Sequence, residues 1–169
     1  MVSYVDTNVI VSYALGDDNH PKAVKMINEV KNEGQLYIST FTIVELYSVL
    51  SRNISKYKLP PTFEELIHPS MKVKLAVEYA LGKLNFNILP DDSVVKELEG
   101  IKVKAHRLFY KAIKLAPKIK LKTNDLVHIA YAHQLKRKGK IDSIMTLDED
   151  FKKKRDLIKK HTKLLVKYQ

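Results

Sequence analysis

The stretch YVDTNVIV, residues 4–11, combines the pattern of a buried strand with a carboxylate. Its flanks are apolar and mostly β-branched, which is typical of a buried strand, but its centre holds Asp6, Thr7 and Asn8. A buried carboxylate is costly unless it is paired or binds a cation. Ligands of open parallel sheets bind beyond the carboxyl ends of the strands. We therefore interpret Asp6 either as a ligand at such an end or as the N-cap of a helix that begins near Asn8.

Outward from this stretch, short apolar runs alternate with longer amphipathic ones. The alternation predicts an α/β fold with a mostly parallel central sheet. Strands are expected at residues 3–5, 36–39, 86–89, 141–145 and 163–166. The main helices are expected over residues 20–32, 39–52, 70–84, 123–139 and 147–160, with a long helix from about 92 to 115 that stops before Pro117.

The composition excludes several classes of protein. The 169 residues are 45% apolar and 29% charged, which is typical of one globular domain rather than a disordered chain. The absence of cysteine excludes disulfides and thiolate metal sites. No apolar run approaches the ~20 residues that span a bilayer, and no basic-then-apolar leader precedes Tyr4. We therefore expect a cytoplasmic protein without membrane contact.

Positive charge is concentrated in the second part of the chain. The net charge is +11, and residues 101–169 carry 20 Lys/Arg against 6 Asp/Glu, whereas residues 1–100 carry 10 against 13. Such a distribution is typical of a protein that binds a polyanion, although lysine-rich helix surfaces also promote solubility. One basic run is the predicted contact with a nucleic-acid backbone: Lys152, Lys153, Lys154 and Arg155.

Four further acids stand where a core or a sheet edge is expected. Glu45 lies within the apolar run FTIVELYSVL, Asp125 opens the helix DLVHIAYA, and Asp148 and Asp150 follow the next-to-last strand. Because the carboxyl ends of parallel strands meet at one edge of a sheet, these acids are predicted to converge with Asp6. Clustered carboxylates suit Mg²⁺ or Mn²⁺, and such an ion can activate water and neutralise a phosphodiester.

Each acid also has a purely structural interpretation. Glu45 could pair with a buried arginine, although the chain holds only four arginines. Asp125 could be a first-turn acid favoured by the helix dipole. Asp148 and Asp150 could form a surface turn and an N-cap. Crowding of like charges in the predicted cluster further implies that Glu45→Gln costs little stability, or even adds some.

Taken together, the acidic segments resemble the PIN-domain family. YVDTNVIV is similar to the opening motif of that family, STFTIVELYSVL to its second, LKTNDLVHIAYA to its third and IMTLDEDF to its fourth. The four motifs occur in the expected order between residues 4 and 151. The resemblance implies a three-layer α/β/α sandwich with four to five strands, formed by residues 1–169. It also implies a Mg²⁺- or Mn²⁺-dependent endonuclease that cuts RNA and leaves a 5′-phosphate and a 3′-hydroxyl.

The resemblance also assigns roles to single residues. Four acids would be catalytic and would bind the metal: Asp6, Glu45, Asp125 and Asp148. Asp150 would be an auxiliary metal ligand. Three polar side chains would support this geometry: Thr7, Asn8 and Thr146. His128, one turn beyond Asp125, is expected to pack or to form a hydrogen bond rather than to catalyse.

Among PIN domains the pattern is most similar to the VapC toxins of toxin–antitoxin pairs, which implies a homodimer and a small antitoxin partner. The chain is longer than a typical toxin of this kind, and the additional residues are predicted to form a helical insertion near 53–84. Three alternatives stay open. They are a non-catalytic or weakly active RNA-binding module on the PIN fold, an RNA-processing nuclease without an antitoxin, and a structure-specific DNA nuclease.

Overall fold

A parallel sheet of five strands forms the centre of the molecule. The computed structural model describes residues 2–31, 34–64, 68–90, 94–98 and 103–169. The strands are β1 (Ser3–Val5), β2 (Leu36–Ser39), β3 (Phe86–Leu89), β6 (Ser143–Thr146) and β7 (Leu165–Tyr168), in the spatial order β3-β2-β1-β6-β7. Because β1 pairs in parallel with both β2 and β6, the first strand of the chain is the central one.

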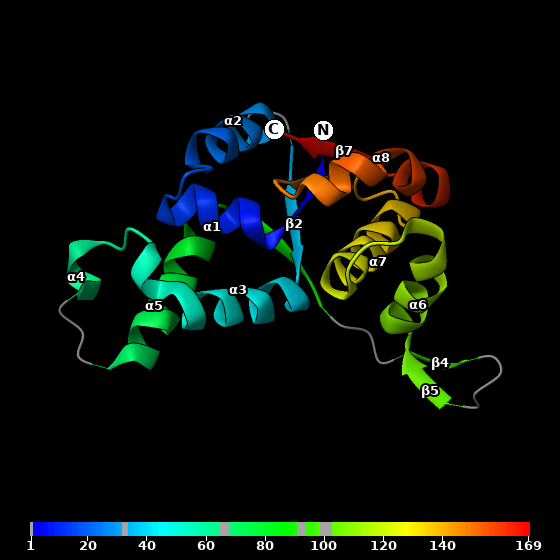
Figure 1. Cartoon of the computed structure of the whole chain (residues 1–169), viewed down its shortest axis with the longest axis horizontal. Helices are drawn as coiled ribbons and strands as arrows, with labels where there is room; N and C mark the ends of the chain where they lie inside the picture. Colours follow the sequence, from blue (N-terminus) through cyan, green and yellow to red (C-terminus); the bar gives the residue numbers. More distant parts are fainter. Residues whose placement is uncertain (1, 32–33, 65–67, 91–93, 99–102) are drawn as a thin grey trace.

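Helices cover both faces of this sheet, which confirms the predicted three-layer α/β/α sandwich (Figure 1). One core contains Val5 and Met145 and is completed by α1 (Thr7–Leu15), α2 (His20–Lys31), α3 (Thr40–Asn53) and α5 (Pro69–Gly82). The other core contains Tyr4 and Ile144 and is completed by α6 (Arg107–Ile119), α7 (Thr123–Arg137) and α8 (Glu149–Thr162). Successive side chains of a strand point to opposite faces, so Tyr4 and Val5 lie in different cores.

The last two strands begin two residues later than the sequence predicts. The strand expected at 141–145 is β6, and the strand expected at 163–166 is β7. Lys163 ends α8 with a left-handed backbone, φ 62°, so β7 begins only after this turn. The register follows from the pairing of Ser143 with Ser3 on one side and with Leu165 on the other.

The prediction of one long helix over about 92–115 is wrong. The described part of this stretch forms an antiparallel pair, β4 (Val95–Leu98) and β5 (Val103–His106), followed by α6. Apolar and charged residues alternate along much of VVKELEGIKVKAH, which is the period of a strand rather than of a helix. Helix α6 also continues through Pro117, contrary to the prediction, because the proline lies in its last turn, before Lys120 ends the helix. Residues 91–93 and 99–102 lie outside the described residues.

Residues 53–84 are partly helical where the structure describes them. They include η1 (Ile54–Lys56), α4 (Pro61–Glu64) and α5, and α5 packs against α1 and α3. That this stretch is an insertion stays a prediction. Across the described ranges, every helix is too short or too polar to cross a bilayer.

Candidate active site

Asp6 stands where β1 ends and α1 begins. Its backbone N–H donates to the Met145 carbonyl at 3.0 Å, which continues the pairing of β1 with β6. Its Oδ1 accepts the backbone N–H of Thr7 at 2.8 Å and so caps α1. The residue is only 5% exposed. The N-cap interpretation is therefore correct, and the cap holds the carboxylate at the carboxyl edge of the sheet, where the ligand interpretation requires it.

Thr146 connects the ends of β1 and β6. Its hydroxyl donates to Asp6 Oδ2 at 2.7 Å and accepts the backbone N–H of Asp148 at 3.0 Å. The Asn8 amide donates to the same hydroxyl at 3.3 Å, and the Asn8 carbonyl oxygen accepts the Leu147 N–H at 3.1 Å. These bonds fix the orientation of Asp6 and the path of the chain toward Asp148.

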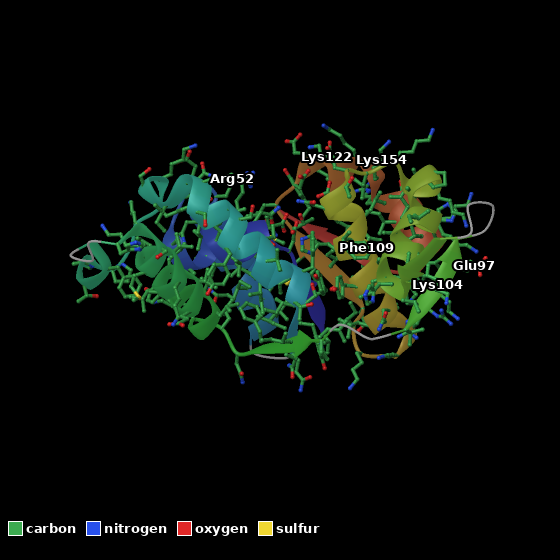
Figure 2. The ribbon with its side chains drawn as sticks, turned by 90° about the horizontal axis from the view of Figure 1, so that it is seen from below. Arg52, Glu97, Lys104, Phe109, Lys122 and Lys154 are labelled. Carbon is green, nitrogen blue, oxygen red and sulfur yellow. The ribbon has the colours of Figure 1, made fainter. Side chains whose placement is uncertain are left out.

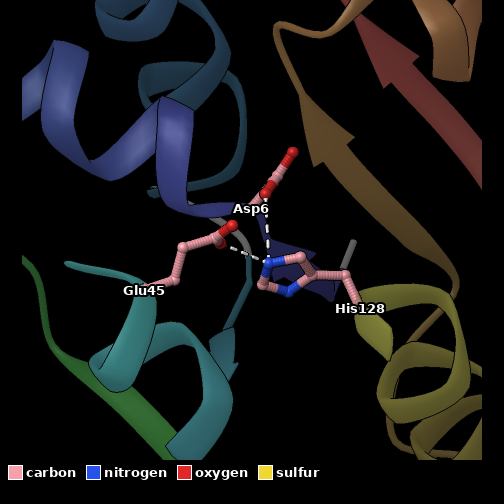
Figure 3. A group of neighbouring side chains, drawn as sticks. All are labelled: Asp6, Glu45 and His128. Carbon is pink, nitrogen blue, oxygen red and sulfur yellow. Dashed lines mark hydrogen bonds and ion pairs between the residues drawn. The ribbon is translucent and has the colours of Figure 1, made fainter. Parts of the chain in front are cut away.

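Glu45 reaches the same edge from α3, which Ser39 caps. The Thr7 hydroxyl donates to its Oε2 at 2.5 Å, and the Asn124 amide donates to its Oε1 at 3.0 Å. His128 Nε2 lies 2.7 Å from Oε2 (Figure 3). Burial by itself would raise the pKa of Glu45, but these hydrogen bonds, led by that of His128, lower it. Glu45 thus pairs with a histidine instead of the arginine considered from the sequence.

His128 is a buried link between Glu45 and the central strand. It is 1% exposed, its Nδ1 lies 2.9 Å from the Tyr4 hydroxyl, and its Nε2 lies 3.5 Å from Asp6 Oδ1. Burial lowers the pKa of His128, but Tyr4 and the carboxylates of Glu45 and Asp6 raise it more, to well above its usual value. Both ring nitrogens of His128 have partners in this structure, Nδ1 the Tyr4 hydroxyl and Nε2 the Glu45 carboxylate, so the ring links these groups.

The Tyr4 hydroxyl fixes the other side of the imidazole ring. It lies 2.8 Å from Ser39 Oγ and 3.1 Å from Thr42 Oγ1, at the start of α3. One buried network therefore joins β1, α3 and α7. The expectation that His128 forms a hydrogen bond is correct. Its partners, Glu45 and Tyr4, lie 83 and 124 positions away in the sequence. The local sequence therefore shows only a polar residue within an apolar helical run.

Asp125 faces the same edge from the first turn of α7. Its Oδ2 is buried and has no hydrogen-bond partner within the described part of the chain. Burial, together with the charges of Asp6 and Asp148, raises the pKa of Asp125 to about 6. A buried, unpaired oxygen among like charges is a position at which a cation would be stabilised.

The four acids predicted to be catalytic line one pocket of about 230 Å³: Asp6, Glu45, Asp125 and Asp148. Thr7 and Asn8 line it too. Asp150 is not among the described lining residues, because its Oδ2 lies 3.3 Å from Lys122 Nζ, outside the pocket. Asp148 Oδ1 accepts the backbone N–H of Asp150 at 2.7 Å, so Asp148 also caps α8, as the structural interpretation predicted.

Sequence reasoning missed a fifth acid of the pocket, Asp17. It follows Gly16, whose φ of 66° turns the chain at the end of α1. Its carboxylate accepts the Ser12 hydroxyl and the backbone N–H of Asn19, both at 2.9 Å. The glycine–acid turn is the signal that marks this position.

The predicted nucleic-acid contact lies on α8, whose N-cap, Asp148, lines the acidic pocket. Lys153 Nζ lies 3.6 Å from Glu149 and 3.9 Å from Asp150, and Lys152 Nζ lies 4.8 Å from the centre of the Tyr168 ring. Exposed pairs of this kind contribute little stability, so these side chains are free to leave them for a phosphate.

The protein is therefore an α/β protein with an acidic pocket at the carboxyl edge of a parallel sheet. The PIN domain model matches residues 3–157, and the chain belongs to the PIN-domain family. A comparison with curated proteins found no match to the sequence.

Several solved structures share the fold at low sequence identity. VapBC-1 from nontypeable Haemophilus influenzae is 17% identical, with 99% of this chain and 98% of that chain covered and a TM-score of 0.56. VapBC2 from Rickettsia felis, bound to a DNA fragment from its promoter, is 13% identical, with 99% and 98% covered and a TM-score of 0.55. The Sarcin-Ricin loop cleaving toxin VapC20 from Mycobacterium tuberculosis is 16% identical, with 90% and 94% covered and a TM-score of 0.56.

Asp125→Asn is expected to stabilise the metal-free protein at neutral pH. The folded pKa of Asp125 is raised to about 6, so the folded protein favours the protonated, neutral carboxyl. The stability that this carboxyl contributes is therefore present below about pH 4 and is lost as the pH rises through 6 and the group ionises. Such a shift corresponds to about 3 kcal/mol, and to roughly 1 kcal/mol once solvent screening of the partly exposed carboxyl is allowed for. Urea denaturation in EDTA at pH 4 and pH 7 measures the difference. The exposed Asp156→Asn is the control, and equal stability of Asp125→Asn and wild type at pH 7 contradicts the prediction.

Glu45→Gln is expected to lose stability, which reverses the expectation from the sequence. The lowered pKa means that the carboxylate stabilises the fold above the unfolded value of 4.5, and that this contribution is lost as the pH falls through the folded value. Losing the charged partner of His128 lowers the free energy of unfolding by about 1–3 kcal/mol at pH 7 and by less near pH 4. Thermal and urea unfolding measure this, with the exposed Glu78→Gln as the matched control. An unchanged melting temperature would mean that the pair contributes nothing to stability.

Proposed function

We propose that the protein is a metal-dependent endoribonuclease. The observation that carries the proposal is the convergence of four carboxylates, from four separate segments, on one pocket at the carboxyl edge of the sheet. Four buried or half-buried acids in one pocket destabilise a fold unless a cation or hydrogen bonds compensate them, because like charges repel and burial penalises each charge. Pure binding of a polyanion would gain from losing these charges, which favours catalysis over a non-catalytic RNA-binding module.

The donor set fits a hard divalent cation. Asp6, Asp125 and Asp148 supply carboxylate oxygens, the ligands preferred by Mg²⁺ and Mn²⁺, and Asp125 Oδ2 has no other described partner. Asp6, Glu45 and His128 also place one atom each within 4.8 Å of one another. Because both ring nitrogens of His128 already have partners, we assign the three aspartates as the metal ligands and place Glu45 beside them. When bound, the cation would activate water and neutralise charge on the phosphodiester.

The side chains of the chain itself then position the reactants. Glu45, whose lowered pKa keeps it ionised, accepts a hydrogen bond from the attacking water and orients it in line with the phosphorus–oxygen bond to be broken. Thr7 and His128 hold Glu45, and Thr146 and Asn8 hold Asp6. Attack in line with the P–O3′ bond, which breaks with O3′ as the leaving group, leaves a 5′-phosphate and a 3′-hydroxyl. In this arrangement Asp150 is auxiliary and keeps Lys122 near the pocket.

Single-stranded RNA would cross the pocket along a cationic rim. Figure 2 shows Arg52, Lys122 and Lys154 along one margin of the molecule. Lys154 belongs to the run Lys152–Arg155 of α8, whose side chains project around the helix. Cations along the rim hold the phosphate backbone while the acidic pocket carries the metal.

We further propose that the protein is the toxin of a toxin–antitoxin pair and forms a homodimer. The similar structures include VapBC complexes, which supports a small antitoxin protein as a partner. An exposed apolar surface supports a protein interface: Val44 on α3 is 64% exposed, and Phe109 and Ile113 on α6 are 52% and 50% exposed. Monomers rarely keep large contiguous apolar patches in solvent.

Metal-dependent RNA cleavage that is lost in Asp6→Asn is the expected result of the central test. Labelled RNA and single-stranded DNA are incubated with wild type and variant in Mg²⁺, Mn²⁺ or EDTA. Removing a metal ligand is expected to lower the rate by roughly 100-fold or more. Equal activity of the variant would indicate a contaminating nuclease. Salt-sensitive binding without cleavage would favour the RNA-binding module, and cleavage of DNA alone would favour the DNA nuclease.

Replacement of Lys152, Lys153 and Lys154 by alanine is expected to weaken RNA binding. Each phosphate of a single strand that a lysine neutralises contributes about 0.7 to the slope of log affinity against log salt concentration. The slope should therefore become shallower by that amount for each lysine of the run that binds a phosphate in the wild type. Fluorescence anisotropy at several salt concentrations measures the slope. A slope equal to that of wild type would show that the run faces away from the RNA.

A further inference from the structure

The segment Lys56-Tyr57-Lys58 lies beside the acidic pocket, and the proposed mechanism does not use it. Lys56 is the last residue of η1, Tyr57 and Lys58 follow it, and backbone hydrogen bonds fix the chain here. The Tyr57 N–H donates to the Ile54 carbonyl at 3.3 Å, and the Lys58 N–H donates to the Leu15 carbonyl at the end of α1 at 3.0 Å. Tyr57 is half-buried, and both lysines are exposed.

Tyr57 stands between two cavities. It lines the acidic pocket together with Asp17, and the same two residues line a neighbouring open cavity of about 710 Å³. The second cavity is also lined by two lysines and a histidine, Lys56, Lys58 and His20, and by one further acid, Asp18. Helices α1 and α3, which carry the acidic end of this path, lie side by side in Figure 1 and pack together. A chain that leaves the carboxylates along this path therefore meets first the tyrosine and then the two lysines.

This order of groups matches the chemistry of single-stranded nucleic acid. Bases stack on aromatic rings without regard to their identity, and phosphates are held by lysines. Next to Tyr57 the Asp17 carboxylate repels phosphate, so a base rather than a phosphate is favoured at that point. Burial and the Asp17 charge both raise the pKa of Tyr57, so its hydroxyl stays neutral.

We propose that Tyr57 is a stacking platform for one base of single-stranded RNA next to the cleaved phosphate, and that Lys56 and Lys58 hold the phosphate beyond it. The proposal rests on the proposed ribonuclease function for the position of the cleaved bond. It assigns a substrate-binding role to the segment between α3 and α4. The specificity is for an unpaired base of any type, because a duplex cannot turn one base onto the ring.

The test measures binding to short single-stranded RNAs in the Asp6→Asn background with Mg²⁺. Each RNA carries one abasic nucleotide, at a different position. Tyr57→Leu should weaken binding of the intact RNA about tenfold, since a base on an aromatic ring contributes that order of affinity. Tyr57→Phe should bind like the parent, because stacking needs the ring and not the hydroxyl. Tyr47→Leu, at an exposed tyrosine of α3 that lines neither cavity, is the matched control.

The abasic RNAs separate stacking from a general loss of structure. At one position the abasic RNA should bind about tenfold more weakly to the parent, and there Tyr57→Leu should cause no further loss. Equal losses at every position, or unchanged binding by Tyr57→Leu, would overturn the proposal. Lys56→Ala with Lys58→Ala should also make the salt dependence shallower. The double change Lys74→Ala with Lys83→Ala on α5 should not, and equal slopes for the two pairs would overturn the role of the lysines.

Cleavage by otherwise wild-type protein distinguishes this proposal from the proposed function. If RNA is cleaved, Tyr57→Leu should raise KM about tenfold and change kcat less than twofold. Cleavage with an unchanged KM would overturn the stacking site while the ribonuclease stands. Position-specific binding through Tyr57 without any cleavage would keep the stacking site and overturn the ribonuclease.

Discussion

The hydrogen bond between the buried imidazole of His128 and Glu45 is the interaction on which the pocket depends. Without this hydrogen bond, the carboxylate of Glu45 would have only two neutral donors, the Thr7 hydroxyl and the Asn124 amide. The same ring faces Asp6 and is held from behind by Tyr4, so one side chain sets the distance between β1, α3 and α7. An ion pair of this kind is retained for geometry, since a buried pair often contributes little net stability over apolar residues of the same size.

Three of the remaining acids are tolerated because they stand at the beginnings of helices. Asp6 caps α1, Asp148 caps α8, and Asp125 lies in the first turn of α7. The unpaired N–H groups and the dipole of a helix favour negative charge at its first turn. Three helices therefore direct their positive ends at one pocket. This partly offsets the repulsion among the carboxylates, and the raised pKa of Asp125 shows that the compensation is incomplete.

The acidic pocket belongs to a chain whose net charge is +11. Lys122 marks the boundary between the two regions of charge: it pairs with Asp150, and the charges of Asp150, Asp148 and Asp125 raise its pKa. The cationic rim and the acidic pocket are thus adjacent rather than mixed. A polyanion can be attracted by the rim and still reach a site that, alone, would repel it. This separation is consistent with a protein that binds a phosphodiester backbone and cuts it with the help of a cation.

The sequence by itself determined the sheet, most of the helices and the four acids of the pocket. These depend on local rules, such as strand and helix periods, N-caps, and the convergence of parallel strand ends at one edge. The predicted helix over about 92–115 is wrong at residues 95–98 and 103–106, where a strand period was taken for a helix, and correct from Arg107 onward. Only the tertiary structure decided that His128 joins Asp6 to Glu45, that Asp125 Oδ2 lacks a described partner, and that Asp17 and Tyr57 border the pocket. The physical reason is that burial and pairing depend on groups far apart in the chain, which only packing brings together.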